Sequence, residues 1–382
     1  MKALAIALFL CSAAALAEPP VLIGGSVART GQLADLSGEY VKGLELWQAD
    51  VNARGGLLGR NVELQLVDDE SSARRAAEIT GELIAQGKAD LLVGPFGSPA
   101  TLAAAVVAER EQRVMVNATG AADNVHRRAL RYVFQLIPPA SEQALPVLKL
   151  AVKIGARAIT VFARGGAGGA LERLREAAKP AGLTLIESGA LPTPTLMPAN
   201  YPPLIAKIDR GSVVVVFDDS LHLADIVRAM KQAGFRPRAF VSPDVLHGDY
   251  IRRIGIDAEY SIGLSAYEPR ARTRGNAEFV RSFEAKHKRP PELYAACGWA
   301  TGQLIEAAVA RAGSIDTAEL REALAQLETE TVLGAYKVDA NGAQRAATAM
   351  LVQILKGRRE VIWPENFRSA DAVLAPPAWD RR

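Results

Sequence analysis

The sequence has little cysteine. It holds two, Cys11 and Cys297, and the first lies in an apolar N-terminal run that we expect to be removed. One remaining cysteine excludes an internal disulfide, so a core of ordinary size has to hold the fold without covalent crosslinks. We therefore expect Cys297 to be a buried free thiol.

The sequence has no strong excess of charge of one sign. The formal net charge is +3, and no run of lysine and arginine is concentrated enough to indicate a nucleic-acid partner. The overall composition is that of a globular protein, and the length predicts two domains.

Long apolar runs are also scarce. The longest, residues 3–10, follows Lys2 and precedes Ala15-Leu16-Ala17. It is too short for a membrane-spanning helix, which needs about 20 residues, and it has the pattern of a secretory signal peptide. We expect a signal peptide at residues 1–17, a mature chain that begins near Glu18, a periplasmic location and no membrane-embedded segment. Cys11 raises a lipoprotein alternative, but it follows Phe9-Leu10, where lipoproteins usually have a small residue.

Catalytic and metal-binding patterns are missing. The four histidines show no metal spacing, and no nucleophile motif is present. Asp68-Asp69-Glu70 is interpreted as a turn and not as a metal site. The Gly-rich loop 163–169 lacks the spacing of a nucleotide-binding loop. We expect no cofactor, no metal and no enzymatic activity. The histidines are His126, His222, His247 and His287.

What the sequence does contain is an alternation of short β-branched runs with longer amphipathic ones, which predicts β-α-β units and parallel sheets. Tyr40, Leu44, Trp47 and Val51 recur at helical spacing before Gly55-Gly56 ends the run. We predict strands at residues 21–27, 62–67, 90–94 and 113–116. A second set has strands at 158–163, 184–188, 212–217 and 238–242, with helices at 145–152, 170–181 and 222–233. Helices follow at 276–287, 293–312 and 316–327, and the turn 339–342 is expected to join two strands in a hairpin.

Three stretches resemble the type I periplasmic binding proteins of the leucine/isoleucine/valine-binding kind, which are substrate-binding proteins of ABC transporters. They are GQLADLSGEYVKGLELWQADVNARGGLLGRNVELQLVDDESS, LIAQGKADLLVGPFGSPAT and IVRAMKQAGFRPRAFVSPD. The resemblance implies an α/β fold with two Rossmann-like lobes, whose parallel-rich central sheets are joined by crossing hinge strands. It places residues 20–136 and 267–338 in lobe 1 and residues 137–266 and 344–372 in lobe 2.

The loop GPFGSP at residues 94–99 is the first candidate binding motif. It lies between a strand and a helix, so Phe96, Gly97 and Ser98 would lie at a helix N-terminus, which favours a carboxylate. We expect Ser98 to be the N-cap and Pro99 the first helical residue. Ser98 either caps only its own helix or also binds the ligand.

The loop after the fourth strand is the second candidate. By the resemblance, Ala118 offers a carbonyl to a ligand ammonium and Thr119 a hydroxyl to its carboxylate, with Asn117 behind them. The alternative is that Thr119 starts a helix.

In lobe 2, Asp244 falls where the family places an acidic residue that pairs with the ligand's ammonium. Asp218 and Asp219 end a strand at the edge expected to face the cleft, and they either contact the ligand or are solvated caps. The aromatic residues that the family places around the ligand are missing at Leu36-Ser37 and in the loop 163–169. Phe96, Phe217 and Tyr267 are candidate replacements, with core packing as the alternative for Phe217.

These observations predict a monomeric binding protein that closes around a small-molecule ligand, an amino acid or a related compound, and delivers it to an inner-membrane ABC permease. A periplasmic sensor of the same fold is the alternative, and an exported enzyme is a weaker one. The sequence leaves open the identity of the ligand and the role of the Pro-rich stretch 191–203.

Overall fold

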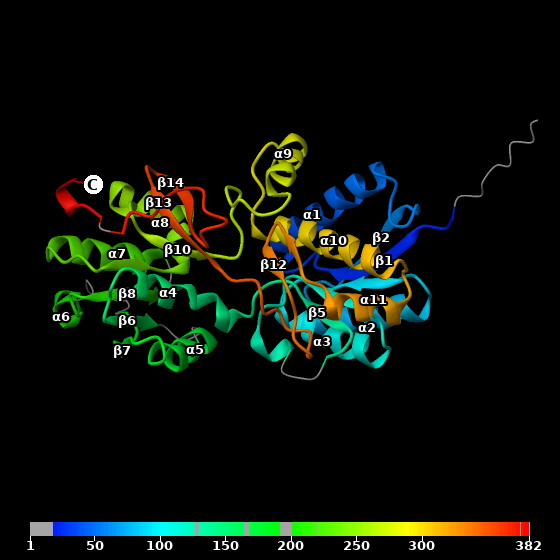
Figure 1. The fold of residues 1–382 in the computed structure, drawn as a ribbon, viewed down its shortest axis with the longest axis horizontal. Helices are drawn as coiled ribbons and strands as arrows, with labels where there is room; N and C mark the ends of the chain where they lie inside the picture. The colour runs from blue at the N-terminus through cyan, green and yellow to red at the C-terminus, as the bar shows by residue number, and fades with distance from the viewer. Residues whose placement is uncertain are drawn as a thin grey trace, which may run out of the picture.

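The computed structural model describes residues 18–126, 130–163, 168–191, 201–218, 220–374 and 376–381. The predicted signal peptide, Asp219, and parts of the Gly-rich loop and of the Pro-rich stretch lie outside these residues. Within them, the chain forms two α/β bodies, one around a five-stranded sheet and one around a seven-stranded sheet. We call these bodies lobe 1 and lobe 2. They lie end to end along the long axis of the molecule (Figure 1).

Lobe 1 contains a wholly parallel sheet in the order β2-β1-β3-β4-β5. Strand β1 begins at the outer end of the molecule and runs toward the middle (Figure 1). The carboxyl ends of all five strands therefore face lobe 2. The strands are β1 Val21–Val27, β2 Val62–Asp68, β3 Leu91–Val93, β4 Met115–Asn117 and β5 Val133–Gln135.

Helices cover both faces of this sheet. On one face, α1 (Ala34–Ala53) packs beside α10 (Leu293–Ala312). The predicted apolar stripe of α1 is confirmed, because Tyr40, Leu44, Trp47 and Val51 are all buried. On the other face, α2 (Ala73–Ala85) and α3 (Ser98–Arg110) cover β3 and β4. The remaining helices of lobe 1 are α9 (Asn276–His287) and α11 (Thr317–Gln326).

Lobe 2 contains a sheet in the order β14-β13-β10-β9-β8-β6-β7. Its first five strands along the chain are parallel, and the last two, β13 and β14, are antiparallel to their neighbours. The strands are β6 Ala158–Ala163, β7 Thr184–Glu187, β8 Ser212–Phe217, β9 Ala239–Val241, β10 Ile262–Ser265, β13 Met350–Leu355 and β14 Arg358–Trp363.

Two hydrophobic clusters lie on opposite faces of this sheet. Val214 and Val216 of β8 point into the cluster under α7, and Val213 and Val215 point into the cluster under α4 and α5. The alternation follows from the two-residue period of a strand that is buried on both faces. The helices are α4 Pro146–Lys153, α5 Gly168–Ala178, α6 Pro202–Lys207, α7 Ser220–Gln232 and α8 Gly248–Ile254.

The chain passes between the lobes three times. It leaves lobe 1 after β5, returns after β10 to form α9, α10 and α11, and leaves again after β12 to form β13 and β14. The predicted fold class, two lobes with parallel-rich sheets joined by crossing segments, is confirmed.

The predicted hairpin at 339–342 is only partly formed. The turn closes, with the backbone N–H of Gly342 donating to Asp339 O at 3.0 Å. The flanking runs pair only through an isolated bridge between Val338 and Gln344. The true hairpin precedes this turn and joins β11 (Thr329–Thr331) to β12 (Gly334–Tyr336). The strand after the turn, β13, joins the other sheet because the chain is crossing between lobes here.

Candidate functional site

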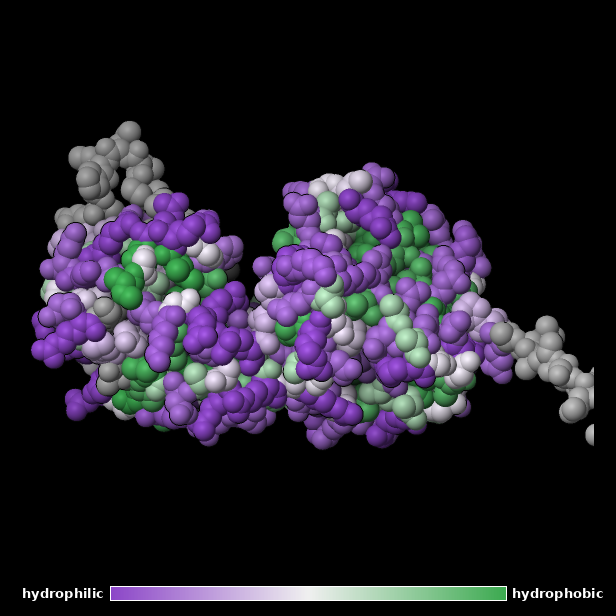
Figure 2. All heavy atoms as spheres, turned by 90° about the horizontal axis from the view of Figure 1, so that it is seen from above, coloured by the Kyte–Doolittle hydropathy of each residue, from purple (hydrophilic) through white to green (hydrophobic). Residues whose placement is uncertain are grey.

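The strand order of each sheet identifies where a ligand would lie. In lobe 1 the chain order reverses between the neighbours β1 and β3, and in lobe 2 it reverses between β6 and β8. Open α/β sheets bind ligands outside the carboxyl ends of the strands at such a switch point. The space-filling view shows a deep indentation between the two lobes (Figure 2). In lobe 1 the switch-point loops are residues 28–33 and 94–97.

Ser98 lies at the lobe 1 switch point, but it is not the N-cap as predicted. Helix α3 begins at Ser98, and Gly97 precedes it with φ 86° and no capping side chain. Ser98 Oγ instead accepts a hydrogen bond from the backbone N–H of Ala122 at 3.1 Å. A serine hydroxyl can donate as well as accept, and none of the hydrogen bonds among the described residues uses the Ser98 proton. The side chain therefore holds a neighbouring loop and keeps a donor.

Thr119 joins the two candidate loops of lobe 1. Its Oγ1 donates to Pro95 O at 2.9 Å and accepts from the backbone N–H of Gly97 at 3.1 Å. No helix starts at Thr119, because the residue lies in a bend after β4. The alternative interpretation of Thr119 as a helix start is therefore wrong. Its hydroxyl is committed to the loop, and one acceptor position remains for another donor.

Asn117 and Ala118 lie at the start of the same loop. Both are buried. Asn117 Oδ1 accepts from the backbone N–H of Gly120 at 2.8 Å, and its Nδ2 donates to Gly120 O at 2.9 Å. This two-way bond closes a tight turn, and a Cβ on Gly120 would lie only 2.7 Å from the side chain of Thr101. The loop is thus held in one shape by its own residues.

Phe96 has an aromatic neighbour that the sequence did not indicate. Its ring meets Tyr294 of α10 edge to face, with 4.8 Å between centroids, and burial raises the pKa of Tyr294. Leu33 approaches the same loop, 3.7 Å from the position that a Cβ on Gly97 would take. Phe96 is buried in the lobe 1 core, and the partly buried Tyr294 and Leu33 pack against that core. Only contacts across the fold, and no sequence spacing, could have identified Tyr294.

Tyr267 is likewise a core residue, so it does not replace the missing aromatic residues of the cleft. It is buried, its hydroxyl donates to Asn276 Oδ1 at 2.9 Å, and its ring packs on Phe279 in the lobe 1 core. Phe217 is partly buried and packs against the lobe 2 cluster that contains α4 and α5. The core-packing interpretation is therefore the one that the structure supports for Phe217.

The acidic candidates of lobe 2 lie after β8 and β9. The side chain of Asp218 is buried, and its Oδ1 lies 3.2 Å from His222 Nδ1 of α7. Asp219 lies outside the described residues. Asp244 is half-buried and lies in the short helix Pro243–Leu246. The backbone N–H of Asp244 donates a hydrogen bond to Ser242 Oγ at 3.3 Å.

Asp68 and Asp69 hold the loop after β1. Asp68 accepts hydrogen bonds from Thr30 and from the backbone of Arg29, and Asp69 accepts one from Ser26 Oγ at 2.9 Å. Burial alone would raise the pKa of Asp68, but hydrogen bonds from Glu70, Thr30 and Arg29 lower it overall. The turn interpretation is confirmed. Among the residues that the structure describes, no group of histidine, cysteine or acidic side chains is placed to hold a metal ion.

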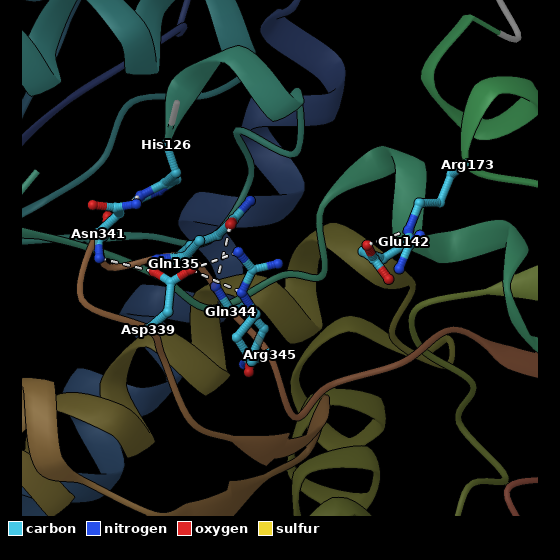
Figure 3. Close-up of polar contacts among 9 residues, drawn as sticks. His126, Gln135, Glu142, Arg173, Asp339, Asn341, Gln344 and Arg345 are labelled. Atoms are coloured by element: carbon cyan, nitrogen blue, oxygen red, sulfur yellow. Dashed lines mark hydrogen bonds and ion pairs between the residues drawn. The ribbon is translucent and has the colours of Figure 1, made fainter. Parts of the chain in front are cut away.

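The hinge carries a buried amide bracket. Gln344 on the third connection donates from Nε2 to Leu136 O on the first, at 3.1 Å, and to Ala335 O at 3.3 Å. Its backbone N–H also donates to Gln135 Oε1. Both glutamines are buried. Figure 3 shows the two close together. The bracket ties two of the three connections to each other.

A polar pocket lies beside this bracket, with an empty volume of about 650 Å³ that includes open solvent. His126 lines the pocket, and its Nδ1 lies 3.0 Å from the backbone oxygen of Asn341 (Figure 3). Arg345 forms an ion pair with Asp339 at 2.6 Å. Burial lowers the pKa of His126. Of the charged side chains that line this pocket, Arg345 and Glu142 are in ion pairs, with Asp339 and Arg173.

One acidic residue connects the lobes directly. Asp123 follows the Thr119 loop of lobe 1, and its Oδ1 accepts from Ser141 Oγ at 2.6 Å. Its Oδ2 lies so close to Gly169 in the first turn of α5 that a Cβ there would be only 2.7 Å away. Arg173 of α5 pairs with Glu142 at 2.8 Å (Figure 3). The sequence did not point to Asp123, because its contact with Gly169 depends on tertiary packing and has no sequence pattern.

Two further observations bear on the class of protein. In the part of the chain that the structure describes, no helix has the length and apolar character of a membrane span. Cys297 lies buried in α10, where burial raises the pKa of its thiol. It is a free, buried thiol, as predicted.

Comparison with known proteins agrees with this geometry. A family model described as periplasmic binding protein matches residues 20–359. The Leu/Ile/Val-binding protein homolog 7 of Brucella abortus is 24% identical over 92% of this chain and 93% of its own length. The amino acid binding protein of Pseudomonas aeruginosa is 26% identical over 84% of this chain and 87% of its own length.

A solved structure shows the same fold. The ABC transporter substrate-binding protein of Desulfitobacterium hafniense in complex with Leu is 19% identical and has a TM-score of 0.71, covering 90% of this chain and 100% of that one. The predicted resemblance to leucine/isoleucine/valine-binding proteins is confirmed. The chain belongs to the periplasmic binding protein family.

Proposed function

We propose that this protein is the substrate-binding component of an ABC uptake system, and that it binds an amino acid or a related small polar compound between its lobes. The observation that carries the proposal is the pair of switch points, whose loops lie at the strand edges that face the middle of the molecule. The family membership supports the uptake role. Binding without catalysis, a periplasmic location, a monomeric state and delivery to an inner-membrane permease belong to the same proposal.

The lobe boundaries of the proposal are residues 20–136 with 267–338, and residues 137–266 with 344–372. Supporting them, β1 to β5 join one sheet, and β6 to β10 with β13 and β14 join the other. Closure is a hinge motion about the three connections, and the ligand favours it by its higher affinity for the closed form.

Ser98 and the first turn of α3 provide the anion site. Helix N-termini have backbone N–H groups without intrahelical partners and carry a partial positive charge. The Ser98 proton adds one further donor. Together these groups suit a ligand carboxylate, with Phe96 and Ala118 of the same loops beside it.

Asp244 supplies the opposite charge from lobe 2 when the cleft closes, and Asp219, which follows β8 in the sequence, is a second candidate. A charge-assisted bond to an ammonium is stronger once water is excluded from the cleft. The ligand class is therefore a compound with both a carboxylate and an amine.

Isothermal titration of refolded, ligand-stripped protein tests this class. The panel contains amino acids and, as matched compounds, the same carbon skeletons without the amine. Amino acids should bind, and Asp244→Asn should weaken them by about 10-fold to 100-fold, the loss expected for one charge-assisted bond. Binding only to the amine-free acids would refute the ligand class and leave the fold unaffected.

The second candidate function is that of a sensor of the same fold, which would also bind its ligand in the cleft and close around it. The two differ in the partner of the closed form, so pull-down with the liganded protein separates them. Recovery of a permease supports uptake, and recovery of a regulatory kinase in its place would support sensing.

A further inference from the structure

The end of lobe 2 that is farthest from the cleft carries an unusual row of arginines. Arg157, Arg210 and Arg238 each stand just before a strand, namely β6, β8 and β9, and these three strands are neighbours in the sheet. Amino ends of parallel strands meet at one edge of a sheet. All three side chains are exposed, as is Arg236. The arginines therefore share the edge opposite to the cleft.

A groove is hollowed into this edge. Arg210, Arg236 and Arg238 line it together with Pro237, Leu374 and Pro376, and its empty volume is about 840 Å³ with the open solvent at its mouth included. The apolar residues come from the turn before β9 and from the C-terminal tail. The tail is fixed here, because Trp379 Nε1 donates to Phe235 O at 2.9 Å. The groove therefore combines guanidinium groups with an apolar wall.

Within the described ranges of the chain, no acidic side chain neutralises the charges in this groove. No ion pair among the described residues involves Arg210, Arg236 or Arg238, and Arg238 makes only a long 3.5 Å bond to Ile154 O. Asp209 is close in sequence, but its Oδ1 accepts the backbone N–H of Gly211 at 2.6 Å, and neither it nor Asp380 lines the groove. Stretch 192–200, which lies outside the description, contains no acidic residue.

The equivalent edge of lobe 1 differs. There Arg60 donates to Pro19 O at 2.7 Å and Arg113 donates to Asp90 O at 3.1 Å, so both guanidinium groups bind the protein's own backbone. Those arginines hold backbone at the start of the strands, whereas among the groove arginines only Arg238 makes a backbone contact to a residue that the structure describes, the 3.5 Å bond to Ile154 O.

We propose that this groove is a docking site for an acidic polypeptide segment of a partner protein. Guanidinium groups bind carboxylates in a planar, two-point manner, and several of them along one groove match a run of acidic side chains. The apolar wall and the concave shape favour a polypeptide over a flat membrane surface. Because the groove lies at the edge opposite to the cleft, docking leaves the cleft free to open and close.

The probe is a fluorescein-labelled peptide of alternating glutamate and alanine, with a glutamine-alanine peptide as its uncharged match. Fluorescence anisotropy should show that the glutamate peptide binds and the glutamine peptide does not. The double variant Arg210→Gln with Arg236→Gln should weaken binding by about tenfold or more, since two charge-assisted bonds are lost.

The control variant is Arg74→Gln with Arg110→Gln. It makes the same change in net charge at two exposed, ion-paired arginines of lobe 1, and it should bind the peptide like the unmodified protein. Equal weakening by both double variants would overturn the proposal, because net charge alone would then explain binding. Binding to phosphatidylglycerol vesicles without binding to the glutamate peptide would also overturn it.

The same samples separate this proposal from the proposed function. Amino-acid titration reports on the cleft and should be unchanged in the Arg210→Gln, Arg236→Gln protein. If titration shows no cleft ligand but the peptide still binds, the uptake role fails while the docking site stands.

Discussion

At the scale of single residues, Thr119 is the polar side chain on which the lobe 1 site depends most directly. Its hydroxyl joins the Pro95-Gly97 loop to the loop after β4 by one donated and one accepted hydrogen bond. The residue is only 8% exposed, so replacement by valine would leave the Gly97 N–H and the Pro95 carbonyl without this partner.

We therefore predict that Thr119→Val lowers the free energy of unfolding by about 1–3 kcal/mol and also weakens ligand binding. Thr119→Ser keeps the hydroxyl and should stay close to the unmodified protein in both respects. Urea unfolding and calorimetric titration measure the two effects. Normal affinity in a destabilised valine variant would show that the loop does not contribute to the site.

His126 gives a prediction about pH. Its folded-state pKa is lowered from 6.5, chiefly by burial, so the unfolded chain binds the proton more readily than the folded chain. The neutral ring therefore contributes stability that is fully present above about pH 6.5 and is lost as the pH falls through the lowered folded value.

The melting temperature of the unmodified protein should thus fall more steeply than that of His126→Gln between about pH 7 and pH 5. The matched control is His247→Gln, which removes an exposed histidine and should keep the steep fall. Parallel curves for His126→Gln and the unmodified protein would contradict the assignment.

At the scale of elements, the closest packing in lobe 1 is between α1 and α10. A Cβ on Gly298 would lie 2.2 Å from Tyr40 O, and one on Gly43 would lie 2.0 Å from Ala295 O. The two helices approach so closely because glycine faces backbone on both sides. A methyl group at either position would push the helices apart.

Gly298→Ala should therefore destabilise the protein by about 1–3 kcal/mol, the usual cost of overpacking. Gly38→Ala is the control, because Gly38 lies in α1 with nothing within 4 Å of its Cβ position. That change should be neutral or should stabilise by about 0.5–1 kcal/mol. Urea unfolding measures the free energy of unfolding of both variants. Equal stability of Gly298→Ala and Gly38→Ala would show that the two helices can separate at no cost.

The elements that the sequence predicted best are those with clear ends. Strands β1, β6 and β8 and helices α9 and α10 have the predicted bounds, since each is a continuous apolar or amphipathic run between turn residues. Strands β5 and β10 were not individually predicted. They have three and four residues. The chain passes to the other lobe directly after each of them, so they lie at the ends of the β-α-β alternation that located the equally short β3, β4 and β9.

The site residues show a similar division. The loops that carry Phe96, Gly97, Ser98 and Thr119 could be located, because a loop after a predicted parallel strand lies at a known edge of the sheet. The partners of those side chains could not. Ser98 holds Ala122, and Phe96 packs on Tyr294 of a helix that is distant in sequence; both contacts depend on tertiary packing.

At the scale of the whole molecule, periodicity did not reveal that the chain crosses between lobes three times; that expectation came from the family resemblance. The hinge is stabilised by polar contacts that have no sequence pattern, such as the bond from Gln344 to Leu136. The contact between Asp123 and the first turn of α5 is of the same kind, but it joins the two lobes and so depends on the angle between them.

Between the lobes, Asp123 Oδ1 accepts a hydrogen bond from Ser141 Oγ, and Asp123 Oδ2 lies against Gly169 at the positive end of α5. A charge at a helix N-terminus contributes about 0.3–1 kcal/mol. If the contact belongs to the open form, Asp123→Asn makes closure easier, and apparent affinity rises because more of the protein can reach the closed form. We expect about twofold to fivefold tighter binding and a smaller radius of gyration in small-angle scattering.

Ser141→Ala should also tighten binding and reduce the radius of gyration. The control is Asp249→Asn, which changes an exposed acid of α8 that pairs with Arg252 and should alter neither quantity. Weaker binding by Asp123→Asn would mean instead that the contact persists or strengthens on closure, and that Asp123 stabilises the closed lobes.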